Sequence, residues 1–62
     1  MKNILTIKDL SNMLKMSKST LYKYAEQSII PSFKLGTSIR FYEHEIENYL
    51  TNIIKEQRKD DN

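Results

Sequence analysis

The 62-residue sequence contains no cysteine and no tryptophan, and it has a single glycine and a single proline. Without cysteine, neither a disulfide nor a cysteine metal site can support the fold. Apolar residues never form a run of more than a few positions, so the sequence predicts no signal peptide and no membrane span. A chain of this length predicts one domain over residues 1–62, cytoplasmic and too small to enclose a large substrate cavity.

The sequence is also poor in groups that carry out catalysis. His44 is the one histidine, and no second ligand lies at metal-binding spacing from it. The serines have no other candidate base beside them, so nucleophilic catalysis has no support. The carboxylates of Glu43, Glu45 and Glu47 fit the first turns of a helix, whose dipole stabilises them. We therefore predict that the protein is not an enzyme and binds neither a cofactor nor a metal.

Charge is divided unevenly along the chain, although the overall net charge is only +2. Residues 1–42 carry seven lysines or arginines against two acids, a net charge of +5. Residues 43–62 carry three basic residues against six acids, a net charge of −3. A basic body joined to an acidic last segment indicates a polyanionic partner on one side of the molecule, unless the separation arose by chance in a short chain.

The pattern that follows Thr6 predicts a first helix at residues 7–14. Thr6 fits the N-cap, and Asp9 three residues later completes a capping box. Apolar residues recur at helical spacing and are expected to face the core; they are Ile7, Leu10, Met13 and Leu14. Lys15 and Met16 leave only a very short turn before the next cap, which is typical of a helix-turn-helix.

Residues 17–28 predict a second helix that suits a DNA groove. Ser17 fits the N-cap, and the helix must end near Gln27 or Ser28 because Pro31 cannot continue it. The core-facing side is expected to hold Leu21, Tyr24, Ala25 and Ser28. The opposite side can reach phosphates and base edges with Lys18, Ser19, Tyr22, Lys23 and Glu26. An ordinary solvated helix face would show the same pattern.

The segment from Ser32 to Tyr42 changes to a period of two, which predicts a β-hairpin. Its turn is expected at residues 36–38, where Gly36 begins a break in the alternation. One face is predicted to be apolar and to cover the helices; it holds Phe33, Leu35, Ile39 and Phe41. The other face is predicted to be polar and to carry Lys34 and Arg40.

A third helix is predicted from Glu43, with amphipathic spacing at Ile46, Tyr49, Leu50, Ile53 and Ile54. Residues 57–62 contain no apolar side chain, so we expect this tail to fray. Because this arrangement leaves no apolar face uncovered, a monomer in free solution is expected. The whole order of helix, tight turn, helix, hairpin and helix predicts a mainly helical α+β fold, a small winged helix-turn-helix.

The sequence resembles the short excisionase-type DNA-binding domains, also called recombination directionality factors, which are related to the DNA-binding head of mercury-resistance regulators. The resemblance rests on three stretches: LTIKDLSNMLKMSKSTLYKYA, IIPSFKLG and IRFYEHEIENYL. Together they account for most of residues 4–50. The hydroxyl-rich second helix, the Ile-Pro pair, the Leu-Gly pair and the Arg-aromatic pair stand in the order and spacing of that group.

Two positions depart from the family pattern. The family usually has a glycine in the turn between the first two helices, where this chain has Lys15. It usually has another glycine after the second helix, where this chain has Ser28. If either residue adopts a left-handed conformation, the strain costs about 1 kcal/mol. The departures therefore concern local geometry rather than the fold.

The resemblance implies that the second helix enters the major groove of double-stranded DNA, while the hairpin, as the wing, lies along a neighbouring groove or the backbone. Base or near-base contacts then fall to Ser19, Tyr22 and Lys23. Phosphate contacts at the helix N-terminus fall to Ser17, Lys18 and Thr20. Wing contacts fall to Thr37, Ser38 and Arg40, with a backbone contact from Lys34. Tyr24 is instead expected to pack beside Leu21.

The resemblance also implies the role of an excisionase, which binds and bends DNA so that an integrase, a tyrosine recombinase, excises a mobile element. Its partners are then the integrase and neighbouring copies on the DNA, and the acidic third helix and tail are the expected contact surface. A small transcriptional regulator of a phage, plasmid or transposon uses the same contacts and remains an alternative. A second alternative is a protein-interaction module that uses its helix faces for docking.

Overall fold

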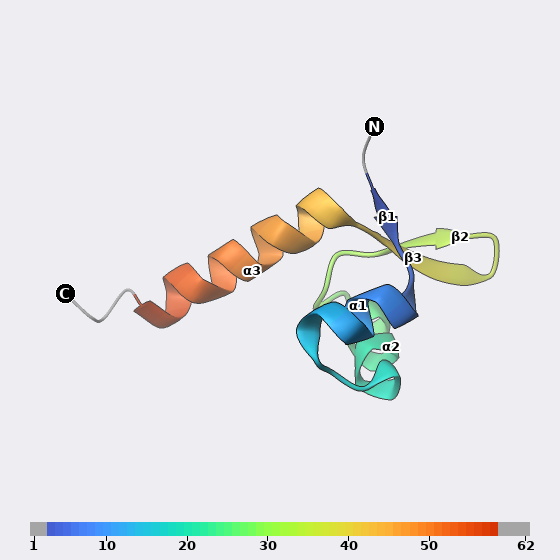
Figure 1. Ribbon diagram of the computed structural model, residues 1–62, viewed down its shortest axis with the longest axis horizontal. Helices are drawn as coiled ribbons and strands as arrows, with labels where there is room; N and C mark the ends of the chain where they lie inside the picture. Colours follow the sequence, from blue (N-terminus) through green and yellow to red (C-terminus); the bar gives the residue numbers. More distant parts are fainter. Residues whose placement is uncertain (1–2, 59–62) are drawn as a thin grey trace.

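Three helices and three short strands make up the computed structural model, which describes residues 3–58 (Figure 1). The order along the chain is β1 (Ile4–Leu5), α1 (Ile7–Leu14), α2 (Lys18–Glu26), β2 (Phe33–Leu35), β3 (Ser38–Tyr42) and α3 (Glu43–Arg58). The strands form an antiparallel sheet in the order β1-β3-β2. This is the α+β layout of a winged helix-turn-helix, in which the β2–β3 hairpin is the wing.

The first two helices begin at the caps that the sequence predicts. At α1, the Thr6 hydroxyl accepts a hydrogen bond from the Asp9 N–H, and the Asp9 carboxylate accepts one from the Thr6 N–H, both at 3.0 Å. At α2, the Ser17 hydroxyl accepts from the Thr20 N–H at 3.2 Å. These bonds satisfy donors that would otherwise be left unpaired in the first turn of each helix.

The core lies where the helices meet the inner face of the sheet. Its buried members come from every helix, from β3 and from the loop after α2: Ile7, Leu10, Leu21, Ala25, Ile30, Phe41 and Ile46. Two predicted core residues do not belong to it. Met13 is 46% exposed, because it lies at the edge of the apolar stripe of α1 rather than at its centre. Ser28 is exposed, because α2 has already ended at Glu26.

The turn of the wing is one residue shorter than predicted. Leu35 pairs with Ser38, so only Gly36 and Thr37 connect the two strands. Gly36 has a φ of +67°, which suits the first position of a two-residue hairpin turn. The predicted three-residue turn would instead have placed Leu35 opposite Ile39. Because side chains alternate between faces, this one-residue difference turns the side chains of one strand to the opposite face of the sheet.

The observed register overturns both predicted faces of the wing. Phe33 pairs with Arg40, and Lys34 pairs with Ile39. Directly opposed side chains share a face, so Lys34 and Arg40 lie on opposite faces rather than together. Phe41 is fully buried on the inner face, where the partly buried Ile39 also packs against the core. The prediction of a single apolar face is therefore wrong, although the hairpin itself is confirmed.

One edge strand of the sheet, and an aromatic pair on its outer face, were not predicted. β1 pairs with β3, and Ile4 lies opposite Tyr42. The rings of Phe33 and Tyr42 stack there with their centroids 4.7 Å apart. Leu35, on the same face near the tip of the wing, is 57% exposed. Half of the apolar residues of the wing thus lie outside the core.

Helix α3 packs on the body at its start and then extends away from it (Figure 1). Ile46 in the second turn is fully buried, whereas Ile54 near the end is 47% exposed. Gln57 and Arg58 are helical, so the prediction of a frayed tail is wrong for these two residues. Residues 59–62, the rest of that tail, lie outside the described residues.

Several large apolar side chains remain at least 45% exposed, among them Ile4, Met13, Ile29, Leu35 and Ile54. The predicted core therefore leaves individual apolar side chains uncovered, and the monomer stays a prediction. The exposed residues are scattered over a strand, two helices, a loop and the wing rather than joined in one patch on a single element. Scattered apolar residues are common on monomeric proteins.

The two non-glycine residues with positive φ among residues 3–58 are those that replace the family's glycines. Lys15 has a φ of 58° and Ser28 has a φ of 58°. We expect Lys15→Gly and Ser28→Gly each to raise the free energy of unfolding by about 1 kcal/mol, because left-handed strain exceeds the entropy that glycine adds to the unfolded chain. Thermal denaturation checks this, with a rise of roughly 4–8 °C expected for each change.

Lys55→Gly is the matched control for these two variants. Lys55 is exposed within α3, where the backbone is helical. Glycine in a helix lowers the free energy of unfolding by roughly 1 kcal/mol, so the melting temperature of the Lys55→Gly protein should fall. A lower melting temperature for Lys15→Gly or Ser28→Gly would contradict the prediction.

Candidate nucleic-acid interface

Basic side chains from three parts of the fold gather around one hollow of about 370 Å³. We call it the cationic hollow. It lies between the start of α1, the outer face of α2 and the wing, and it is lined by Thr6, Ile7, Lys8, Lys18, Tyr22, Lys34, Thr37, Ser38, Ile39 and Arg40. Its lining includes four cations, three hydroxyl-bearing Ser and Thr residues and no carboxylate. That composition suits phosphate oxygens, which accept hydrogen bonds from lysine, arginine and hydroxyl groups.

Six of the ten residues predicted to contact DNA line the cationic hollow. Two come from α2 and four from the wing: Lys18, Tyr22, Lys34, Thr37, Ser38 and Arg40. The fold therefore brings the predicted helix and wing residues around a common space. Lys34 and Arg40 both reach this space although they lie on opposite faces of the hairpin.

The other four predicted residues do not line the hollow. The Ser17 hydroxyl, besides capping α2, donates to the Thr20 hydroxyl at 2.8 Å, so both hydroxyls are engaged at the start of the helix. Ser19 and Lys23 are exposed on α2. Capping alone is sufficient to explain Ser17, while Ser19 and Lys23 stay predictions for the groove-facing side of the helix.

The contribution of α1 to the cationic hollow was not predicted from the sequence. Lys8 is exposed on the first turn of α1 and lines the hollow together with Thr6. Nothing local in the sequence distinguishes Lys8 from the other lysines, because its position depends on where α1 lies relative to the wing.

Electrostatic contact between α1 and the wing supports this placement. Hydrogen bonds from Thr6, from its backbone N–H first and its hydroxyl second, hold the pKa of Asp9 below its usual value. The positive charges of Lys8 and Arg40 lower the pKa of Asp9 further. The Arg40 guanidinium also donates to its neighbour's carbonyl, Ile39 O, at 2.9 Å, which restrains its direction. Arg40 and Lys8 are thus close to the same end of α1.

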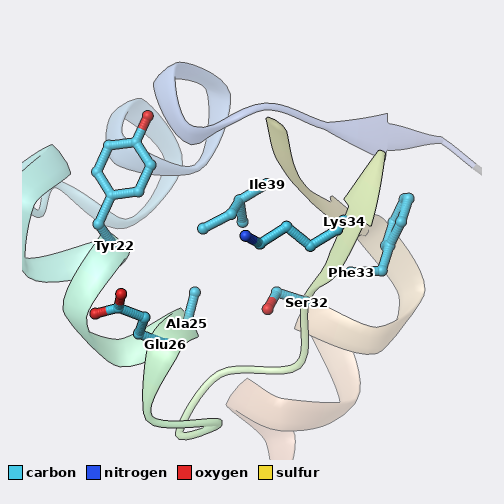
Figure 2. A pocket seen from close by; sticks show the side chains of 7 residues that line it. All are labelled: Tyr22, Ala25, Glu26, Ser32, Phe33, Lys34 and Ile39. Atoms are coloured by element: carbon cyan, nitrogen blue, oxygen red, sulfur yellow. The ribbon is translucent and has the colours of Figure 1, made fainter. Parts of the chain in front are cut away.

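A second hollow, of about 530 Å³, lies beside the first and is called here the wing recess (Figure 2). It is lined by Tyr22, Ala25, Glu26, Ser32, Phe33, Lys34 and Ile39, three of which also line the cationic hollow. In contrast to that hollow, it contains a carboxylate. Figure 2 shows Glu26 on one side and Lys34 reaching in from the wing on the other.

The two tyrosines of α2 have separate environments, as predicted. Tyr24 is partly buried and packs against the core cluster that contains Leu21. Tyr22 is 49% exposed and lines both hollows. Tyr22 is therefore the aromatic residue of α2 that a bound partner can contact.

Comparison with known proteins bears on what this surface does. Residues 4–53 match a family described as a helix-turn-helix domain, which includes excisionase-like proteins. The chain belongs to this family. Its members bind DNA through such a domain and are typically not enzymes, so membership indicates DNA binding for this chain.

The chain is also similar to a longer protein. It is 31% identical over 48 residues to the uncharacterized protein YvgK of Bacillus subtilis (strain 168). The match covers 77% of this chain but 16% of that protein. No solved structure matches the chain.

Two further properties concern the described part of the chain. Within residues 3–58, no helix is long and apolar enough to cross a membrane. The same residues contain no group of three or more His, Cys, Asp or Glu side chains that could hold a metal ion.

Proposed function

We propose that the protein binds double-stranded DNA with α2 in the major groove and one phosphate backbone in the cationic hollow. The observation that carries this proposal is the hollow itself, where Lys8, Lys18, Lys34 and Arg40 converge without a carboxylate in the lining. A DNA strand that passes between a helix and a wing meets both elements at once. The ten predicted residues remain the proposed contacts, and Lys8 is added to them.

Binding to a duplex under increasing salt tests this proposal. If about four phosphates are neutralised, the logarithm of the affinity should fall with the logarithm of salt concentration with a slope of about −3 to −4. Fluorescence anisotropy of a labelled duplex between about 50 and 200 mM salt measures it. No binding at 50 mM salt would contradict DNA binding and favour the protein-interaction module instead.

For the biological role, we propose an excisionase that bends DNA and directs an integrase toward excision of a mobile element. Support comes from the family, which includes excisionase-like proteins. We further propose that the protein acts as a cytoplasmic, non-enzymatic, single-domain monomer that meets neighbouring copies and the integrase through the acidic residues of α3. A genome-wide map of the sites that the tagged protein occupies in its host tests this role. Clustered sites at the end of an element support an excisionase, and sites over unrelated promoters support a transcriptional regulator.

A further inference from the structure

Glu26 stands out among the residues that face the proposed DNA surface, because it is an acid beside a polyanion. It is the last residue of α2 and lines the wing recess (Figure 2). Within residues 3–58, no hydrogen bond or ion pair engages its carboxylate. A carboxylate at the C-terminus of a helix also opposes the helix dipole. Lys34 reaches into the same recess from the wing, but no direct contact within the described residues occupies the Glu26 carboxylate.

Glu26 lies on the exposed side of α2 rather than toward the core. Tyr22 and Glu26 are four residues apart, so they share one face of the helix. That face is the exposed one, while Leu21 and Ala25 face the core and are buried. If α2 enters the major groove, Glu26 lies one helical turn beyond Tyr22 along that groove.

The wing recess differs in chemistry from the adjacent cationic hollow, and the difference indicates a different occupant. A phosphate suits four cations but is repelled by a carboxylate. The recess combines the Glu26 acceptor and one cation, Lys34, with apolar atoms of Ala25 and Ile39. An acceptor beside an apolar surface matches the edge of a base better than it matches a phosphate.

We propose that the wing recess reads one cytosine, with the Glu26 carboxylate accepting a hydrogen bond from the cytosine N4 amino group. This inference rests on the proposed DNA-binding function. In the major groove, guanine and thymine present acceptors that repel a carboxylate, and adenine places its N7 acceptor beside its amino group. Cytosine presents the amino donor without an adjacent acceptor, and its apolar C5 edge suits Ala25 and Ile39.

Selection from a randomised duplex library tests the assignment, with wild-type protein, Glu26→Gln and Glu47→Gln compared. Glu47 is an exposed acid of α3 outside the recess. The contacts proposed for α3 are with neighbouring copies and the integrase rather than with bases, so on a duplex that holds one copy the Glu47→Gln variant makes the same change in charge and serves as the matched control. We expect the wild-type motif to contain one position where cytosine dominates. Glu26→Gln should lose that preference or shift it toward adenine while keeping the other positions, and Glu47→Gln should keep the whole motif.

Two duplexes that differ only at that position then give the size of the effect. The wild-type protein should prefer the C·G duplex by about tenfold, and Glu26→Gln should show no preference for it. An unchanged motif for Glu26→Gln, or uniformly tighter binding to every duplex, overturns this inference alone. A wild-type protein that binds no duplex overturns the proposed function as well.

Discussion

The double variant Lys8→Ala, Arg40→Ala should bind duplex DNA about a hundredfold more weakly than the wild-type protein at 50 mM salt. Both side chains line the cationic hollow from elements other than α2, so their removal leaves the groove-facing helix intact. Each lost phosphate contact lowers the salt slope by about 0.9, so the slope should become shallower by about 1.8. Anisotropy titrations at several salt concentrations measure both quantities.

The matched control for this experiment is Lys55→Ala, Arg58→Ala. It removes the same amount of positive charge from exposed positions at the end of α3, which extends away from the wing (Figure 1). Its salt slope should stay that of the wild type. If both double variants weaken binding equally, net charge rather than the cationic hollow governs the interaction. Because Arg40 also hydrogen bonds within the wing, thermal denaturation must show that the Lys8→Ala, Arg40→Ala protein is folded.

Features that depend on neighbouring residues were predictable from the sequence. Each of the two helix caps joins residues that are three positions apart, Thr6 with Asp9 and Ser17 with Thr20. Pro31 limits where α2 can end. The left-handed backbone at Lys15 and Ser28 was also foreseeable, because glycines occupy these positions in the family that the sequence resembles. Such short-range signals were enough to define the helices and the hairpin.

Features that depend on register or on distant contacts were not predictable in the same way. Adding or removing one residue in the turn at Gly36 moves every side chain of one strand to the other face of the sheet. The residue types in the turn fit either length, so the sequence does not determine the register. β1 has two residues and depends on pairing with β3. Asn3 also links to Glu43, with the Glu43 N–H donating to the Asn3 carbonyl at 3.0 Å. The place of Lys8 in the cationic hollow likewise follows from packing alone.

The two phenylalanines of the wing give the sharpest test of the observed register. By sequence pattern they are equivalent, but Phe41 is fully buried in the core while Phe33 lies on the outer face against Tyr42. Phe41→Ala should cost about 3–5 kcal/mol, because it leaves a cavity in the cluster that joins the helices to the sheet. A domain this small has a total stability of only a few kcal/mol, so Phe41→Ala should be largely unfolded at 25 °C.

Phe33→Ala is the matched control, since it removes the same atoms from the other face. It loses an aromatic stack and partly exposed surface, so we expect a cost of about 1–2 kcal/mol and a protein that still folds. Circular dichroism at 25 °C and thermal denaturation separate the two outcomes. Similar losses for both variants would contradict the register, because only a hairpin with both rings on its inner face makes the two residues equivalent. Phe41→Ala should also lose DNA binding, since unfolding disperses the four cations of the hollow.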